Sequence, residues 1–370
     1  METAKIVVVG AGVVGLAVAA KFSEMNSGVF ILEKNSKYGQ ETSTHNSGVI
    51  HSGIHYPPGS LKAKLCVEAN PVLYEMCEKH RIPFEKLGKL TVAIGEEEIA
   101  ELEKLMKWGT QNGVQGLRFM DGEEVKRLEP NVEVERALLS PSTGIVDADE
   151  LMNHYYAEAY KNGAVLSTHT EVTEISKTAE SYEIKGMSQG ETFSIKAETV
   201  VNCAGLYADR ISEMAGIEVE KAGYRLHLCK GDYYRLVGKS PIKMLVYPLP
   251  KGGGLGIHLT PDLAGTIRLG PNSYYVDKVA YLVESGEKEF REDVKKYVPR
   301  IVEHELVPDF AGVRPKLQGP KDGFKDFVIR NEADKGLDGF INLVGIESPG
   351  LTSAPAIAGL VAEIYANEVK

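Results

Sequence analysis

The sequence predicts a mixed α/β protein in which two domains are interleaved along the chain, and three observations support this. The first 35 residues alternate a β-branched run, a helical pattern and a second apolar run, which is typical of a βαβ unit. Later segments have the short, turn-bounded patterns of an antiparallel sheet. The tail returns to a strand, loop and helix without any linker or repeat, and 370 residues are enough for two domains.

The expected elements can be placed by their periodicity. Lys5 to Val9 is a strand buried on both faces, and the apolar residues of 13–25 have helical spacing. Pro71 is expected to interrupt a helical segment and to begin a second helix. Further strands are expected at 28–34, 88–94, 170–175, 181–187, 198–205, 227–236, within 244–271 and at the start of 340–369; further helices are expected at 60–81, 96–113, 147–163 and at the end of 340–369.

Composition excludes several classes of function. The formal net charge of −10 argues against a nucleic-acid or anionic-membrane surface, because such binding needs clustered Lys and Arg. The four cysteines form no CxxC pair, which is typical of free thiols in a reducing cytoplasm. No apolar run approaches the length of a membrane span. We therefore expect a cytoplasmic protein, and peripheral membrane contact stays open.

A glycine motif lies between the first strand and the first helix. Gly10, Gly12 and Gly15 form GxGxxG, in which the glycines permit a tight turn, a close approach to a pyrophosphate and close packing of helix on strand. Glu33 ends the second strand, where a carboxylate can accept a bond from a ribose hydroxyl. The motif predicts a Rossmann-type dinucleotide site.

The residues after this motif favour FAD over NAD. The stretch Thr42 to Tyr56, TSTHNSGVIHSGIHY, is rich in glycine and hydroxyl groups and can lay backbone N–H groups along a long cofactor. A turn at Ala204-Gly205 and a second at Gly350 to Ser353 each precede a helix. Three glycine turns spread over the chain suit an extended flavin dinucleotide.

Longer motifs reveal a family resemblance. They are HNSGVIHSGI (45–54), SLKAKLC (60–66), TGIVD (143–147), CAGLYADRISE (203–213), KGDYY (230–234), GIHLTP (256–261), LGPN (269–272) and AGVRP (311–315). With these motifs the chain resembles the FAD-dependent oxidoreductases of the D-amino-acid oxidase superfamily, and most closely the L-2-hydroxyglutarate dehydrogenase/oxidase family. The resemblance covers almost the whole chain. His55 and Lys230 depart from it, because relatives often carry an aromatic residue or Arg at the first position and Arg at the second.

The resemblance implies a glutathione-reductase-like FAD-binding domain and an interleaved, mainly antiparallel substrate domain. We expect residues 1–85, 145–220 and 305–370 to form the first domain, and residues 86–144 and 221–304 to form the substrate or cap domain. We expect noncovalent FAD. Its expected contacts are Gly10, Gly12, Val13, Val14, Gly15, Glu33, Lys34, Thr42, Ser43, His45, Asn46, Ser47, Gly48, Val49, Val172, Ala204, Gly205, Gly350, Leu351 and Thr352.

The implied reaction is oxidation of an L-2-hydroxy acid, with L-2-hydroxyglutarate as the leading substrate. A neutral imidazole suits removal of the hydroxyl proton, and His51 and His258 are the leading candidates. Arg314 can clamp a carboxylate with two bonds. Further substrate contacts are expected from Tyr56, Lys230, Tyr233 and Thr260. The spacings of the loop histidines do not match a metal site, so no metal is expected.

Several alternatives stay open. Oxidation of glycerol 3-phosphate shares the superfamily, although phosphate recognition usually needs more than one Arg. An amine or amino-acid oxidase has the same fold, and a flavin-binding subunit without turnover is a different class again. The electron acceptor is equally open, because oxygen, a quinone and a carrier protein are all compatible with the sequence.

Overall fold

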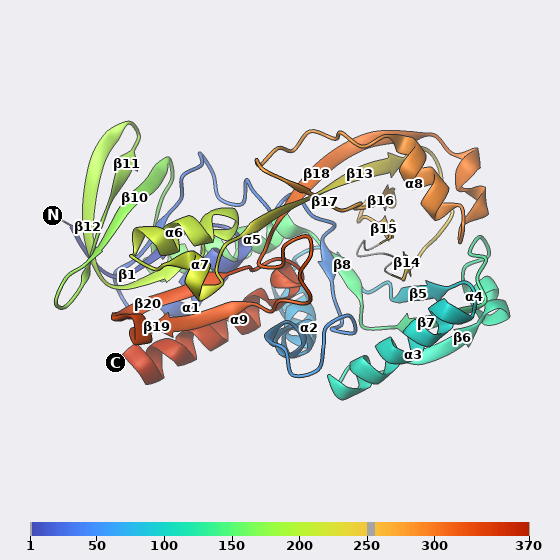
Figure 1. The fold of residues 1–370 in the computed structure, drawn as a ribbon, viewed down its shortest axis with the longest axis horizontal. Helices are drawn as coiled ribbons and strands as arrows, with labels where there is room; N and C mark the ends of the chain where they lie inside the picture. The colour runs from blue at the N-terminus through green and yellow to red at the C-terminus, as the bar shows by residue number, and fades with distance from the viewer. Residues whose placement is uncertain (1, 250–255, 370) are drawn as a thin grey trace. The chain divides into compact units, whose positions relative to one another are not determined.

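The computed structural model describes residues 2–249 and 256–369 (Figure 1). Residues 250–255, inside the region 244–271 in which we expect strands, lie outside the described residues. The chain divides into two compact units. Unit 1 consists of Met1–Thr44, Ala148–Leu228 and Arg314–Lys370, and unit 2 consists of His45–Asp147 and Cys229–Val313.

This division crosses the chain at different points from the expected domain boundaries. We expected residues 45–85 to belong with the glycine motif, but they pack within unit 2. The three-stranded sheet of unit 2 explains this, because Val49 pairs with Ile145 and Phe84 pairs with Val146. The segment is therefore held to its own unit by strands at both of its ends.

Unit 1 is built on an eight-stranded sheet. The first strand, β1 (Glu2–Val9), pairs in parallel with β2 (Val29–Leu32) on one side and with β12 (Glu191–Asn202) on the other. This confirms the predicted βαβ unit. The other strands are β9 (Val165–Ser167), β10 (Thr170–Lys177), β11 (Tyr182–Ser188), β19 (Val328–Glu332) and β20 (Leu337–Val344).

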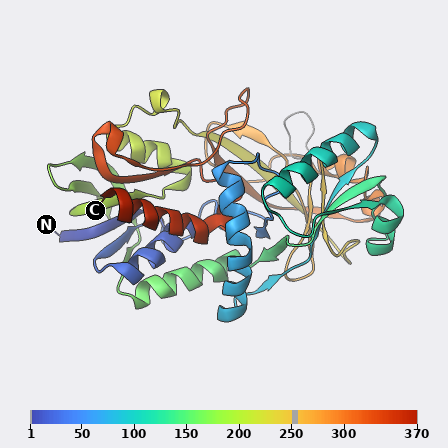
Figure 2. The same cartoon turned by 90° about the horizontal axis from the view of Figure 1, so that it is seen from below.

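Helices cover this sheet. Figure 2 shows α1 (Val13–Met25) between α5 (Ala148–Lys161) and α9 (Gly350–Ile364), and α1 contacts both. Their buried faces are apolar, as in Leu16 and Phe22 of α1. Shorter elements complete the unit: η1 (Gly205–Tyr207), α6 (Ala208–Met214), α7 (Val219–Ala222), η3 (Ala333–Lys335) and η4 (Tyr365–Val369).

Unit 2 contains a nine-stranded, mainly antiparallel sheet. The exception that matters for the site is the parallel pair of β5 (Lys89–Ala93) and β14 (Leu245–Pro248). The other strands of this sheet are β6 (Arg118–Asp121), β7 (Arg136–Ser140), β13 (His227–Leu236), β15 (Leu259–Pro261), β16 (Ile267–Leu269), β17 (Tyr274–Val276) and β18 (Leu306–Lys316). The three-stranded sheet contains β3 (Val49–Ile50), β4 (Phe84–Glu85) and β8 (Gly144–Val146). The predicted mixed α/β fold is confirmed in both units.

The helices of unit 2 include one that corrects a prediction. The helix α2 (Leu61–His80) continues through Pro71, where we expected a break. A proline removes one backbone hydrogen bond, but the buried face of α2, with Leu65, Cys66 and Leu73, holds the helix together on both sides of it. The other helical segments are α3 (Glu96–Gln111), α4 (Gly122–Leu128), α8 (Glu287–Val294) and η2 (Pro299–Glu303). Within the described ranges, no helix combines the length and apolarity that crossing a bilayer requires.

Candidate functional site

The glycine motif forms a tight junction between β1, α1 and the end of β12. Gly10 has a φ of +98°, and a Cβ there would lie 2.6 Å from the carbonyl oxygen of Cys203. A Cβ on Gly15 would collide with the carbonyl oxygen of Gly10. Both positions therefore require glycine, as the motif predicts.

Gly12 has a role that the motif alone does not reveal. A Cβ at Gly12 would lie 2.9 Å from the hydroxyl oxygen of Ser43, and that hydroxyl accepts a hydrogen bond of 2.9 Å from the backbone N–H of Val13. Ser43 thus occupies the space beside Gly12 and satisfies one N–H in the first turn of α1. The loop that follows β2 is thereby tied to the glycine motif.

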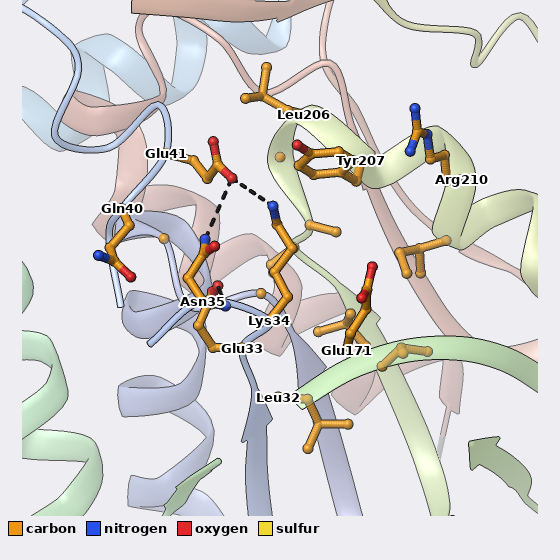
Figure 3. A pocket seen from close by; sticks show the side chains of 18 of the residues that line it. Leu32, Glu33, Lys34, Asn35, Gln40, Glu41, Glu171, Leu206, Tyr207 and Arg210 are labelled. Atoms are coloured by element: carbon orange, nitrogen blue, oxygen red, sulfur yellow. Dashed lines mark hydrogen bonds and ion pairs between the residues drawn. The ribbon is translucent and has the colours of Figure 1, made fainter. Parts of the chain in front are cut away.

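Glu33 fixes the other side of the junction. Its carboxylate accepts a bond of 2.9 Å from the N–H of Ala11 and one of 2.8 Å from the N–H of Asn35. The residue is only 7% exposed and lines a pocket of about 320 Å³ (Figure 3). A carboxylate has about four acceptor positions. Glu33 can therefore hold the glycine motif and still accept a bond from a ligand hydroxyl.

The pocket collects part of the expected cofactor contacts. Those that line it are Gly10, Gly12, Glu33, Lys34, Thr42, Ser43, Val172, Ala204 and Gly205. Val13, Val14, Gly15, Gly350, Leu351 and Thr352 lie elsewhere in unit 1, and the last three form the first turn of α9. His45, Asn46, Ser47, Gly48 and Val49 belong to unit 2.

The structure adds Glu41, Tyr207 and Arg210 to the pocket, which the sequence analysis missed. The Lys34 ammonium forms an ion pair of 2.6 Å with Glu41 and lies 4.1 Å from the ring centre of Tyr207 (Figure 3). Burial lowers the pKa of Lys34, but the hydrogen bond and charge of Glu41 outweigh this effect, so the pKa is raised. Arg210 also lines the pocket. The CAGLYADR motif that contains Tyr207 and Arg210 was the signal that could have identified them.

A second cluster of polar side chains lies in unit 2, where three imidazoles and a lysine meet. The ammonium nitrogen of Lys89 is 2.8 Å from Nε2 of His55 and 4.9 Å from the ring centre of Tyr247. Tyr247 in turn stacks on His258, with ring centres 3.6 Å apart and planes at 9°. The parallel register that places Tyr247 beside Thr91 brings β5 and β14 together, and β15 follows His258 directly.

His51 joins this cluster from the loop after β3. Its carbonyl oxygen accepts a bond of 2.9 Å from the side-chain amide of Asn70 on α2, and the thiol of Cys66 lies 3.5 Å from the same oxygen. Desolvation, followed by the charge of Lys89, lowers the pKa of His51 to about 3. The same two causes, with smaller contributions from the other two imidazoles, lower the pKa of His55 well below its usual value. Both side chains are therefore neutral at physiological pH.

Lys89 is the residue of this cluster that the sequence analysis missed. It is 0% exposed, and desolvation lowers its pKa to about 7. Among the residues that the structure describes, no carboxylate lies within ion-pair distance of its nitrogen. A buried lysine without a counter-charge is uncommon and often marks a functional position. Its place at the start of an apolar strand gave no signal beyond the residue type itself.

Replacing Lys89 with Met is expected to stabilise the protein at neutral and acidic pH. Because the pKa falls from 10.5 to about 7 on folding, the unfolded chain binds more protons between these values, and wild-type stability rises with pH across this window. Below pH 7 the penalty is fully present and amounts to roughly 2–5 kcal/mol. Thermal unfolding followed by circular dichroism should show the largest gain in Tm at pH 6, shrinking toward pH 10.

The matched control for this prediction is Lys86→Met, which removes the same charge from an exposed position three residues earlier. It should change Tm little at any pH. A Lys89→Met protein that is less stable than wild type at pH 6 would contradict the view that the Lys89 charge is uncompensated.

The remaining expected substrate contacts have different surroundings. Lys230 is 1% exposed, and its ammonium donates to the carbonyl oxygen of Leu282 at 2.6 Å and pairs with Glu284 at 3.1 Å. These contacts give Lys230 partners within unit 2, and its expected role as a substrate cation stays a prediction. Tyr233 stacks on Phe310 at 4.4 Å.

The structure shows the surroundings of three further expected substrate contacts. Thr260 is buried in β15, and its hydroxyl lies 3.5 Å from that of Tyr247. Tyr56 is held through its carbonyl oxygen, which accepts a bond of 2.9 Å from the side-chain amide of Asn112. Arg314 lies near the end of β18, is partly exposed and belongs to unit 1.

The loop from His45 to Gly48 is held within unit 2 by ring contacts and by β18. His45 stacks on Tyr281 with ring centres 3.9 Å apart. A Cβ on Gly312 would collide with the carbonyl oxygen of His45, so β18 approaches this loop closely. The Ser47 hydroxyl donates to the Tyr233 hydroxyl at 3.1 Å. These contacts hold the loop in place within unit 2.

Comparisons with known proteins identify the family of the chain. The family model for FAD dependent oxidoreductases, DAO, matches residues 5–364. The mitochondrial L-2-hydroxyglutarate dehydrogenase of Arabidopsis thaliana is 39% identical over 98% of this chain and 84% of that protein. A glycerol 3-phosphate dehydrogenase of Caloramator mitchellensis is 34% identical over 99% and 74%. The structure of dithionite-reduced L-alpha-glycerophosphate oxidase from Mycoplasma pneumoniae with FAD bound has a TM-score of 0.87 and 29% identity, and the match covers 100% of this chain and 96% of that one. The chain therefore belongs to the DAO family of FAD-dependent oxidoreductases.

Proposed function

We propose that this protein oxidises L-2-hydroxyglutarate to 2-oxoglutarate with FAD as the electron acceptor. The observation that carries the proposal is the cluster of neutral imidazoles around Lys89, in a chain that is 39% identical to an L-2-hydroxyglutarate dehydrogenase. Oxidation of a 2-hydroxy acid needs a base for the hydroxyl proton and cations for the carboxylates. Unit 2 offers imidazoles for the first task, and Arg314 is our candidate cation for the second.

The residues of unit 1 fit the ADP half of FAD. The glycine junction leaves no room for side chains, the helix α1 begins beside it, and Glu33 retains acceptor positions toward the pocket. Bound FAD supplies an acceptor for the hydride that leaves the carbinol carbon. We propose that Glu33 binds a ribose hydroxyl and that the first turn of α1 faces the pyrophosphate.

The protein's own residues then handle the proton and the charge. His51, which is neutral and held by Asn70, is our candidate for the base that accepts the hydroxyl proton. Substrate carboxylates nearby would raise the pKa of His51 and so make it a stronger base. His258, whose ring stacks on Tyr247, is our candidate for orienting the hydroxyl or sharing the proton. Arg314 is our candidate for clamping one carboxylate.

Glycerol 3-phosphate oxidation is the second candidate function. It is favoured by the Caloramator mitchellensis relative and by the likeness to the Mycoplasma pneumoniae oxidase. The loop carries His55 rather than an Arg, which would stay charged at every pH and suit a phosphate better. This argues mildly against glycerol 3-phosphate. Both candidates need an anionic substrate, so charge alone does not separate them.

A substrate panel separates these functions. The purified FAD-loaded protein is mixed without oxygen with L-2-hydroxyglutarate, its D isomer, glycerol 3-phosphate, glycine or L-proline, and bleaching of the flavin absorbance is recorded. We expect rapid bleaching by L-2-hydroxyglutarate alone. Faster bleaching by glycerol 3-phosphate would replace the proposed substrate. Adding oxygen, a quinone analogue or a dye to the reduced protein then identifies the class of electron acceptor.

Replacing Glu33 with Gln should weaken FAD binding. The change removes a charge-assisted bond to ribose and also weakens the bonds from the N–H groups of Ala11 and Asn35. A loss of about 1.5–3 kcal/mol corresponds to a fall in affinity of roughly ten- to a hundred-fold. Fluorescence titration of the apoprotein with FAD measures this, and the rate of flavin reduction in fully loaded protein should change little. Unchanged affinity would place ribose recognition elsewhere.

A further inference from the structure

The contact between Lys89 and His55 restricts where protons can be. An ammonium only donates hydrogen bonds, whereas a neutral imidazole has one donor nitrogen and one acceptor nitrogen. At 2.8 Å, a charged Lys89 must therefore donate to Nε2 of His55, which leaves the His55 proton on Nδ1. A neutral Lys89 can instead accept a bond from Nε2–H. The charge of Lys89 and the tautomer of His55 are thus coupled.

The surroundings of this pair are desolvated but polar. Thr91 lies two residues from Lys89 on the same face of β5, and its buried hydroxyl has no hydrogen-bond partner within the described part of the chain. On the neighbouring β7, Ser140 is paired with Lys89 and donates to the Ser52 hydroxyl at 2.7 Å. No carboxylate from the described residues reaches Lys89. The surroundings of Lys89 and His55 therefore offer hydroxyl groups and a positive charge that would favour an anion. Among the described residues, no carboxylate supplies that anion.

We propose that Lys89 is a positioning residue that acts through His55. In its charged form it presents His55 as an Nδ1–H donor and supplies the positive charge that favours an anionic substrate beside the imidazoles. The proposal rests on the proposed function only in assuming that the substrate is an anion. Because Lys89 itself is 0% exposed, His55 and the field of the ammonium, rather than a direct bond, transmit its effect.

This role has a defined dependence on pH. An anion binds more tightly while Lys89 is charged, so its affinity should fall as pH rises through the pKa of about 7. Among the described residues, the other titratable groups around Lys89 are His55 and His51 from the loop after β3, Cys66 from α2, Tyr247 from β14, and His258 before β15. Lowered pKa values keep His55 and His51 neutral above pH 6, while raised pKa values keep Cys66 and Tyr247 neutral below pH 9. His258 is the one group that needs a separate variant.

The first test reads the tautomer without any substrate. Nitrogen-15 NMR of histidine-labelled, FAD-loaded protein at pH 6 should show His55 protonated at Nδ1, with the signal assigned by its loss in His55→Gln. In Lys89→Met this fixed tautomer should be lost. The proposal is wrong if His55 carries its proton on Nε2 at pH 6, or if Lys89→Met leaves the tautomer unchanged.

The second test measures anion affinity from pH 6 to 9, using the shift of the flavin spectrum on binding of 2-oxoglutarate. In wild type the Kd should rise about tenfold per pH unit above the pKa of Lys89. Lys89→Met should bind 2-oxoglutarate weakly, and its Kd should not rise with pH. Lys89→Arg should recover affinity, and its Kd should also stay level, because Arg stays charged. The rise should persist in His258→Gln and in the control Lys86→Met. Loss of the rise in His258→Gln, or its persistence in Lys89→Met, would overturn the proposal.

Two further comparisons separate this inference from the proposed substrate. His55→Gln keeps an acceptor for Lys89 and a donor for the ligand, so it should bind 2-oxoglutarate more tightly than His55→Leu does. Equal affinities of the two variants would contradict the role of His55. If 2-oxoglutarate fails to bind but glycerol 3-phosphate binds with the same pH profile, the proposed substrate is wrong and the role of Lys89 is supported.

Discussion

Replacing Arg314 with Ala should lower kcat/KM for L-2-hydroxyglutarate by about thirty- to several-thousand-fold. If Arg314 clamps a substrate carboxylate, its loss leaves that carboxylate unpaired in a partly desolvated site, which costs roughly 2–5 kcal/mol. Anaerobic stopped-flow reduction measures the effect, and the visible flavin spectrum should stay normal, because the glycine junction and Glu33 are untouched.

Arg314→Lys is the matched variant, because an ammonium keeps the charge but loses the planar fork that makes two parallel bonds. It should recover only part of the lost efficiency. Near-normal reduction by Arg314→Ala would remove Arg314 from the site. Lys62, which is buried in α2, would then be the next cation to test, since Lys230 is already paired with Glu284.

The nucleotide-binding part of the chain could be predicted because its signals are local. The strand, the glycine motif and α1 follow one another within 25 residues, and the spacing of Gly10 and Gly15 reflects contacts made inside this segment. The predicted role of Gly12 was less complete. Its neighbour Ser43 lies 31 residues away, and no local pattern shows which side chain fills the space beside a glycine.

The substrate side depends on contacts between distant segments. Lys89 and His55 are 34 residues apart, and Tyr247 reaches them because β14 pairs in parallel with β5 across more than 150 residues of sequence. In the sequence, Lys89 is simply the first residue of an apolar strand, a position where a lysine usually reaches solvent. Its burial and its missing counter-charge are properties of the assembled sheet.

The domain boundaries also depend on contacts between distant segments, which the local sequence does not reveal. Residues 45–85 come after the βαβ unit in the sequence, so the expected division kept them with it. Their strands at both ends pair with β8, which comes after them in the sequence, and this holds them in unit 2 instead. The continuation of α2 through Pro71 has a similar cause, because its buried apolar face outweighs the local preference for a break.

Replacing His51 with Gln should slow flavin reduction by L-2-hydroxyglutarate by roughly 10²–10⁴-fold, the usual contribution of a general base. Glutamine can still donate a bond to the substrate, but it cannot take up a proton at neutral pH. Because the pKa of His51 is lowered to about 3, wild-type protein keeps this base free down to about pH 5. The apparent second-order rate constant for reduction should therefore stay level from pH 5 to 7 and fall above pH 7, as Lys89 loses its charge.

The comparison with His258→Gln decides between the two imidazoles. His258 is fixed by its stack on Tyr247 at 3.6 Å, and the glutamine side chain that replaces it retains a donor, so an orienting role predicts a loss of only about tenfold. If both residues handle the same proton, the double variant should be little slower than His51→Gln alone, because groups that act as a unit are not additive. If instead His258→Gln abolishes reduction while His51→Gln reduces the flavin at nearly the wild-type rate, the base is His258. The lowered pKa of His51 would then reflect its burial beside Lys89 rather than a role in proton transfer.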